Sequence, residues 1–97
     1  MPTPVVPTPT PAPPPAALQV IIQGFGYQPQ SIEIEAGTTV TWTNRDPVQH
    51  DADDREGSWD GPLLDEGGTW SRTFPAAGAF LVTCSIHPYM QSLVTVR

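Results

Sequence analysis

Hydrophobic and polar residues alternate along several short stretches of the chain, which is the pattern of half-buried β-strands. In residues 18–23, Leu18, Val20 and Ile22 fall on one face of such a strand. In residues 31–35, two isoleucines alternate with a serine and two glutamates. The same alternation recurs in residues 38–44, 69–74, 79–84 and a last strand that contains Val94 and Val96. The pattern predicts about seven to eight short strands.

No segment of the chain shows a helical period. Short strands separated by glycine- and proline-containing turns, here at residues 24–29, 36–37 and 75–78, are typical of two packed β-sheets. We therefore expect an all-β fold, a Greek-key β-sandwich, in which residues 18–97 form one domain.

A polar and acidic connection interrupts the strand pattern between residues 51 and 68. It has at most short strands, and Pro47 predicts a turn before a short strand that carries His50. The predicted inward-facing anchors of this connection are Trp59, Leu63 and Leu64.

Arg72 conflicts with the alternation because it shares a strand face with Trp70 and Phe74. A β-bulge would shift the facing of the residues around it. Alternatively, the aliphatic stem of Arg72 lies along apolar surface and its guanidinium reaches water. The sequence leaves both arrangements open.

Residues 1–17 contain eight of the thirteen prolines in the chain. Proline donates no backbone hydrogen bond and favours an extended conformation, so this segment is predicted to be a semi-rigid linker or tail. It could tether the domain to an anchor, for instance at a membrane, or be a dispensable extension. A ligand for a proline-recognition module is less favoured, because no basic residue flanks the prolines.

The composition excludes several classes of function. The chain has 97 residues, a formal net charge of −6 and no lysine, so it lacks the basic patch that nucleic acid binding needs. No apolar run approaches the roughly 20 residues that span a bilayer. The N-terminus lacks a basic region followed by an apolar one, so we expect no signal peptide in this sequence. One cysteine cannot form an internal disulfide. We expect the domain itself to be a soluble monomer.

The only cysteine lies in a stretch that offers three soft metal ligands. Cys84, His87 and Met90 supply a thiolate, an imidazole and a thioether within seven residues. A blue-copper site needs two histidines and one cysteine in a plane, with a weak axial methionine. The second histidine has to be His50, because the chain contains no other. The predicted metal ligands are therefore His50, Cys84, His87 and Met90.

Each of these residues has a plainer explanation when it is taken alone. A single cysteine or methionine usually fills an apolar core. Zinc accepts cysteine and histidine but has no role for an axial methionine, and a metal-free sandwich could serve adhesion. An oxidase or a dinuclear copper centre would need further histidines or a second cysteine. The main alternative is an extracytoplasmic copper-binding or delivery protein without a redox role, although only two methionines are present.

The chain resembles the cupredoxins, the small type 1 blue copper proteins of the plastocyanin and amicyanin type. Three segments carry the resemblance: residues 41–46 leading to His50, residues 73–78 leading into the strand of Cys84, and the Cys-x-x-His-Pro-x-Met loop at residues 84–90. The loop is the short, specific ligand loop of amicyanin-like members.

The resemblance implies a non-enzymatic one-electron carrier that cycles one copper ion between Cu(I) and Cu(II). It implies that His50, Cys84 and His87 form the copper plane, with Met90 axial. It also implies that the edge of His87, framed by Pro88, Tyr89 and Met90, reaches the surface and exchanges electrons with redox partner proteins. The expected location is extracytoplasmic, in a periplasm or on the outer face of a membrane.

Asp51 departs from the family pattern, which usually has asparagine directly after the first ligand histidine. We expect Asp51 to bond to the backbone or hydroxyl of Ser85, and its charge to favour Cu(II) and lower the reduction potential. The alternative is a solvated Asp51 that faces away from the loop.

Eight of the ten acidic residues lie between residues 46 and 66. They could steer a basic redox partner or simply form a solvated loop. These residues are Asp46, Asp51, Asp53, Asp54, Glu56, Asp60, Asp65 and Glu66.

Overall fold

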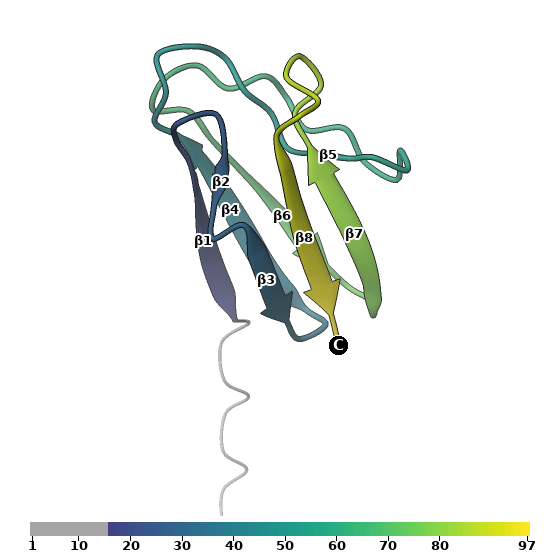
Figure 1. Cartoon of the computed structure of the whole chain (residues 1–97). Coiled ribbons are helices and arrows are strands. Elements are labelled where there is room, and N and C mark those ends of the chain that lie inside the picture. The colour runs from purple at the N-terminus through teal and green to yellow at the C-terminus, as the bar shows by residue number, and fades with distance from the viewer. Residues whose placement is uncertain (1–15) are drawn as a thin grey trace, which may run out of the picture.

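Two four-stranded sheets pack face to face in the computed structural model, which describes residues 16–97 (Figure 1). One sheet has the strand order β2-β1-β4-β6 and the other β3-β8-β7-β5. The strands are β1 (Ala17–Ile22), β2 (Tyr27–Gln28), β3 (Ser31–Ile34), β4 (Thr38–Asn44), β5 (Asp53–Asp54), β6 (Thr69–Phe74), β7 (Gly78–Thr83) and β8 (Gln91–Val96). This arrangement confirms the predicted all-β, Greek-key β-sandwich.

Strands that are distant in sequence pair with each other, which closes the sandwich. β1 runs parallel to β4, and β3 runs parallel to β8, whereas the other paired strands are antiparallel. β1 begins at Ala17, one residue before the predicted domain boundary, and residues 1–15 of the predicted linker lie outside the described residues.

The alternation seen in the sequence corresponds to the two faces of each strand. In β1, Val20 and Ile22 are buried between the sheets, and in β4, Val40 and Trp42 are fully buried. Each such side chain contributes about 1.5–3 kcal/mol when it leaves water. Trp42 stacks on the half-buried Trp70 of the neighbouring strand, with ring centroids 5.5 Å apart.

Arg72 is accommodated without a bulge, because the register of β4 with β6 runs unbroken from Thr38↔Phe74 to Thr43↔Thr69. Its guanidinium carbon lies 4.4 Å from the centroid of the Trp59 ring and 5.3 Å from that of Phe74. The side chain therefore stays on the apolar face and stacks its planar head on aromatic rings, a cation–π arrangement.

Two details of the 46–68 region differ from expectation. Leu63 is 46% exposed, so it is not an inward anchor, whereas Trp59 and Leu64 are buried as predicted. The short strand expected at His50 is a single antiparallel bridge to Leu64. Leu64 takes the inward position because this bridge turns its side chain, and not that of Leu63, toward the core.

The acidic stretch consists of two physically different groups. Glu56, Asp60, Asp65 and Glu66 are exposed, whereas Asp46, Asp51, Asp53 and Asp54 are buried. Buried carboxylates need hydrogen-bond partners to remain charged. The buried group is therefore structural and belongs neither to a steering surface nor to a solvated loop.

The described residues form no helix, and hence none that is long and apolar enough to cross a membrane.

Candidate metal centre

Three connections meet at one end of the sandwich (Figure 1), where His50, Cys84 and His87, three of the four predicted ligands, lie together. Cys84 follows the last residue of β7, and His87 lies in the loop that returns to β8. His50 lies in the connection that leaves β4. The turn between β1 and β2, which contains Phe25, lies against both histidines.

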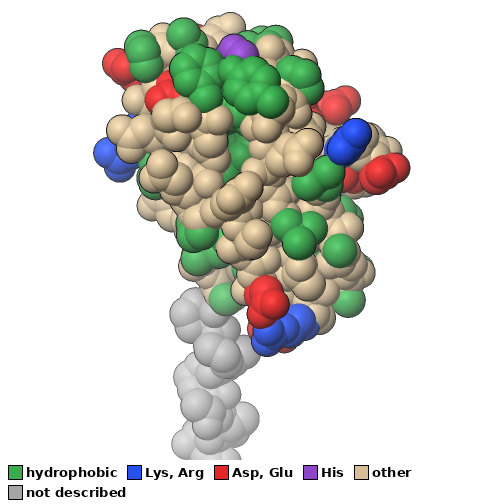
Figure 2. All heavy atoms as spheres, in the orientation of Figure 1, with side chains coloured by type: hydrophobic (Ala, Val, Ile, Leu, Met, Phe, Trp, Pro, Cys, Tyr) green, Lys and Arg blue, Asp and Glu red, His purple; other side chains and the backbone are tan. Residues whose placement is uncertain are grey.

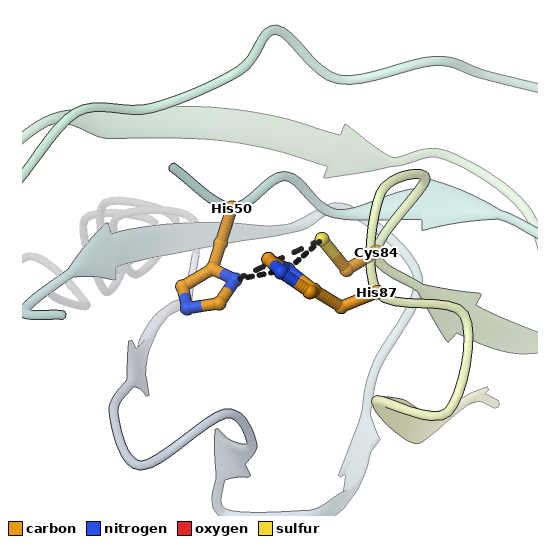
Figure 3. A group of neighbouring side chains, drawn as sticks. All are labelled: His50, Cys84 and His87. Carbon is orange, nitrogen blue, oxygen red and sulfur yellow. Dashed lines mark hydrogen bonds between the residues drawn. The ribbon is translucent and has the colours of Figure 1, made fainter. Parts of the chain in front are cut away.

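The three donor atoms form a compact triangle in the interior of this end (Figure 3). Cys84 Sγ lies 3.8 Å from His50 Nδ1 and 3.7 Å from His87 Nδ1. The two Nδ1 atoms are 3.2 Å apart. His50 and Cys84 are fully buried, and His87 is half-buried. Among the described residues, these three form the one group of histidine, cysteine or acidic side chains with metal-binding geometry.

The size of the triangle suits a metal ion. A point equidistant from the three atoms lies about 2.1 Å from each. For comparison, zinc binds imidazole nitrogen and thiolate sulfur at about 2.0–2.3 Å. Two imidazoles and a thiolate are the in-plane donor set of blue copper sites. The residues present therefore fit a copper ion in size and in chemistry.

Burial raises the pKa of the Cys84 thiol above its ordinary value. Backbone groups of Asp51, Ile86 and His87 oppose this effect by hydrogen bonding to the sulfur. A metal ion binds the thiolate, so metal binding releases the Cys84 proton.

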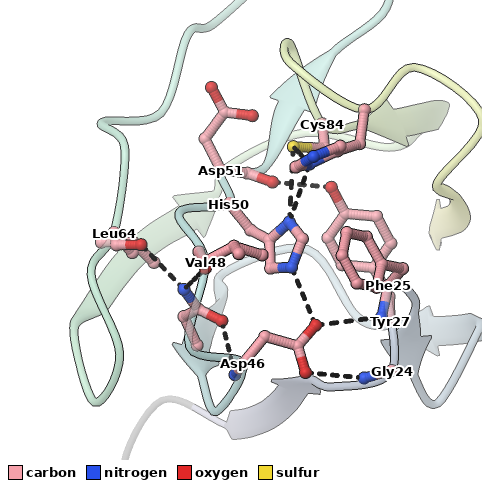
Figure 4. A network of polar contacts seen from close by, with 11 residues as sticks. Gly24, Phe25, Tyr27, Asp46, Val48, His50, Asp51, Leu64 and Cys84 are labelled. Carbon is pink, nitrogen blue, oxygen red and sulfur yellow. Dashed lines mark hydrogen bonds and ion pairs between the residues drawn. The ribbon is translucent and has the colours of Figure 1, made fainter.

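A buried carboxylate fixes the orientation of His50 (Figure 4). His50 Nε2 donates to Asp46 Oδ2 over 2.8 Å, which leaves Nδ1 as the ring nitrogen that faces Cys84 and His87. Burial alone would raise the pKa of Asp46. Hydrogen bonds from the backbone of Phe25 and Gly24 and from His50 outweigh burial and hold that pKa below its usual value.

Comparison with known proteins identifies the family. Residues 16–97 match the family described as copper binding proteins, plastocyanin/azurin family. The chain belongs to this family. Because the match covers the whole described sandwich, this copper-protein family accounts for the fold and the donor triangle together.

Several relatives and solved structures that are similar to this family member are amicyanins. Amicyanin-alpha of Methylorubrum extorquens is 32% identical over 84 residues, which cover 81% of this chain and 71% of that protein. Amicyanin of Paracoccus denitrificans is 31% identical over 86 residues, covering 84% and 66%. The Cu(I) structure of a methionine-to-alanine mutant of amicyanin superposes with a TM-score of 0.79 at 29% identity, covering 84% of this chain and 82% of the other.

As a cupredoxin, the chain is an electron-transfer copper protein with one type 1 copper ion. The group formed by His50, Cys84 and His87 is the candidate site for that ion.

Asp51 contacts the ligand loop of this cupredoxin as predicted. Ser85 donates its backbone N–H to Asp51 Oδ1 over 2.7 Å and its hydroxyl to Asp51 Oδ2. The backbone carbonyl of Asp51 accepts a 2.6 Å hydrogen bond from the Tyr27 hydroxyl, and burial raises the pKa of that phenol. The segment after His50 is thus tied both to the loop after Cys84 and to β2.

The loop between Cys84 and Met90 is held by its own backbone. His87 N–H donates to the carbonyl of Cys84 over 3.2 Å, and Met90 N–H donates to that of His87 over 2.9 Å. Met90 is buried, with 1% of its surface exposed. Its position in the ligand loop is compatible with an axial role, which stays a prediction.

Apolar side chains surround the exposed edge of the site. Phe25, Ile86 and Tyr89 are 43%, 49% and 67% exposed, and the Phe25 and Tyr89 rings pack against the His87 ring. Figure 2 shows hydrophobic side chains gathered around a histidine at this end.

Sequence reasoning missed two residues of the site. In the sequence, Asp46 is one of the acidic residues of the 46–66 stretch, and that pattern does not indicate that it contacts the ring of His50 four residues later. Phe25 lies in the predicted turn at residues 24–29, whose pattern does not indicate a contact with both imidazoles. The one available signal was its position between Gly24 and Gly26, which is typical of a tight turn.

Proposed function

We propose that His50 Nδ1, Cys84 Sγ and His87 Nδ1 hold the copper ion in their plane and that Met90 is its weak axial ligand. The bound ion supplies a centre that alternates between Cu(I) and Cu(II). The observation that carries this proposal is the donor triangle, with sides of 3.2, 3.7 and 3.8 Å.

Hydrogen bonds from neighbouring residues hold the proposed ligands. Asp46 fixes His50, Asp51 ties Ser85 next to Cys84, and backbone hydrogen bonds shape the loop of His87. Because these hydrogen bonds fix the donors, the donors are expected to move little when the oxidation state of the copper changes. A small rearrangement suits electron transfer, whereas a delivery protein needs ligands that release the metal.

The half-buried ring of His87 is the proposed route for electrons. Its apolar surroundings, including Phe25 and Tyr89, allow a partner protein to exclude water at the contact. We propose that the chain docks donor and acceptor proteins there as a monomer, and that it catalyses no reaction of its own. The proposed partners are redox proteins. A net charge of −6 argues against nucleic acids as partners.

We further propose that residues 18–97 are the copper domain and that residues 1–17 link it to an anchor outside the cytoplasm. In a reducing or metal-scavenging compartment, the thiolate of Cys84 would compete with soluble thiols for copper. An extracytoplasmic location, at the periplasmic or outer face of a membrane, removes that competition.

Copper titration of the metal-free protein tests the proposed ligands. One equivalent of Cu(II) is expected to produce an intense blue colour from thiolate-to-copper charge transfer, and a reductant is expected to bleach it reversibly. Cys84→Ser is expected to abolish the colour while the far-ultraviolet circular dichroism stays unchanged. Gln49→Ala, which changes an exposed neighbour of His50, is the control and is expected to stay blue.

A colourless copper complex of the wild-type chain would contradict the proposal and favour copper binding without electron transfer. Retention of the blue colour by Cys84→Ser would remove the thiolate from the site.

A further inference from the structure

One buried carboxylate connects the turn between β1 and β2 to the ligand His50. Asp46 Oδ1 accepts from the backbone N–H of Gly24 over 2.8 Å, and Oδ2 accepts from that of Phe25 over 3.0 Å. The same Oδ2 accepts from His50 Nε2 over 2.8 Å. Figure 4 shows these contacts radiating from a single side chain. Asp46 therefore receives three N–H groups from two separate segments.

Asp46 is itself held in place by Asn44 at the end of β4. Its backbone N–H donates to Asn44 Oδ1 over 2.9 Å. The amide nitrogen of Asn44 donates in turn to the carbonyls of Val48 and Leu64. The carboxylate is thus fixed relative to the sheet, and the groups that it binds are fixed with it.

The turn that Asp46 binds has an unusual backbone at Phe25. The φ angle of Phe25 is 55°, in the left-handed region that residues with a side chain rarely adopt. Such strain persists only where surrounding contacts enforce it. The two hydrogen bonds from Gly24 and Phe25 to Asp46 are contacts of this kind.

The enforced turn places the Phe25 ring across both imidazoles. Its centroid lies 5.2 Å from that of His50 at 84°, and 5.1 Å from that of His87 at 87°. These are edge-to-face contacts, which favour one orientation of each ring. Among the described aromatic residues, Phe25 alone contacts both histidines.

We propose that Asp46 is a positioning residue that couples the Phe25 turn to both imidazoles of the copper site. It fixes the Nε2–H tautomer of His50, so that Nδ1 faces Cys84, and it holds the Phe25 ring that limits rotation of His50 and His87. Its negative charge also favours Cu(II) through His50. This inference rests on the proposed function in taking the two histidines as ligands.

Nuclear magnetic resonance of the metal-free protein tests the positioning without copper. Correlations through the imidazole nitrogens are expected to show His50 with its proton on Nε2. The ring protons of His50 and His87 are expected to carry ring-current shifts from Phe25, which Phe25→Leu removes. A wild-type His50 with its proton on Nδ1 would overturn the proposal.

Asp46→Asn provides the decisive variant, because an amide has one oxygen and cannot accept from all three N–H groups. It is expected to mix the tautomers of His50 and to weaken the ring-current shifts on His87, a residue that Asp46 does not touch. The matched control is Asp65→Asn, which neutralises an exposed carboxylate bonded to Gln49 and is expected to change neither signal. Unaltered His50 and His87 signals in Asp46→Asn would overturn the coupling.

Copper-loaded variants separate this proposal from the proposed function. In Asp46→Asn, the equilibrium between Cu(II) and Cu(I) is expected to shift toward Cu(I) by on the order of tenfold. This corresponds to an upward shift of about 59 mV in reduction potential. An unchanged potential would overturn the proposed role of the Asp46 charge. If the tautomer is as expected but wild-type protein forms no blue complex, the positioning network stands and the copper function fails.

Discussion

Asp51 lies directly after His50 and holds its carboxylate against the backbone and hydroxyl of Ser85. The sequence was sufficient to predict this contact, because Asp51 and Ser85 each directly follow a predicted ligand. It was insufficient for Asp46 and Phe25, because the contact between them joins residues 21 positions apart through a turn whose backbone no propensity predicts. Their roles depend on tertiary structure.

Replacement of Asp51 tests its charge separately from its hydrogen bonds. Asp51→Asn retains an oxygen for the Ser85 N–H but removes a negative charge next to the site. Since that charge favours Cu(II), the reduction potential is expected to rise by roughly 59 mV, a tenfold change. Voltammetry measures it, and Asp60→Asn, at an exposed site, is the control. An unshifted potential would show that the charge has no effect on copper.

Met90→Gln tests the predicted axial ligand. An oxygen donor in place of a thioether stabilises Cu(II), so the protein is expected to retain copper while its reduction potential falls. Voltammetry together with copper analysis provides the measurement. A value equal to that of the wild type would exclude Met90 from the axial position.

At the scale of elements, strand positions follow from alternation, but the faces of irregular segments do not. The sequence predicted β1, β3, β4, β6 and β7 to within two residues, because one face of each strand is buried. It did not distinguish Leu63 from Leu64, because the bridge to His50 sets that facing. Arg72 remained open because cation–π stacking depends on Trp59, which lies in a different segment.

Arg72→Ala tests the contribution of that stacking to the edge strand β6. Loss of the guanidinium over the Trp59 and Phe74 rings is expected to lower the free energy of unfolding by about 1–2 kcal/mol. Denaturant titration of the metal-free protein measures this, with the exposed Arg55→Ala as the control. Equal stabilities of the two variants would indicate that the stacking contributes nothing.

At the scale of the whole molecule, the sandwich brings buried acids from one connection under the copper end. Asp53 lies in β5 beside β7, and its Oδ1 accepts from the Gly61 N–H. Burial, followed by the negative charge of Asp51, raises the pKa of Asp53 to about 6. Asp46 and Asp54 behave oppositely, because hydrogen bonds outweigh burial and lower the pKa of each.

These directions predict how stability depends on pH. Asp53 has a pKa of about 6 in the folded protein and 3.8 as its unfolded value. At pH values between the two, the folded protein carries a proton on Asp53 that the unfolded chain has lost. The free energy of unfolding of the metal-free protein is therefore expected to rise as pH falls from 7 to 5. At pH values below the unfolded pKa of Asp46 and Asp54, the free energy of unfolding is expected to fall as the pH approaches the lowered folded pKa values of these two residues.

Asp53→Asn provides the control for this pH dependence. It keeps an oxygen for the Gly61 N–H and removes the proton uptake, so it is expected to flatten the rise between pH 7 and pH 5. Denaturant titrations at both pH values measure the difference. The same rise in both proteins would show that Asp53 is not its source.

The central claim is that two imidazoles and one thiolate of this chain hold a single copper ion, and X-ray absorption at the copper edge tests it most directly. The copper-loaded protein is expected to show two nitrogen neighbours and one sulfur neighbour at about 2.0–2.3 Å. A first shell of nitrogen and oxygen neighbours without that sulfur would contradict the account.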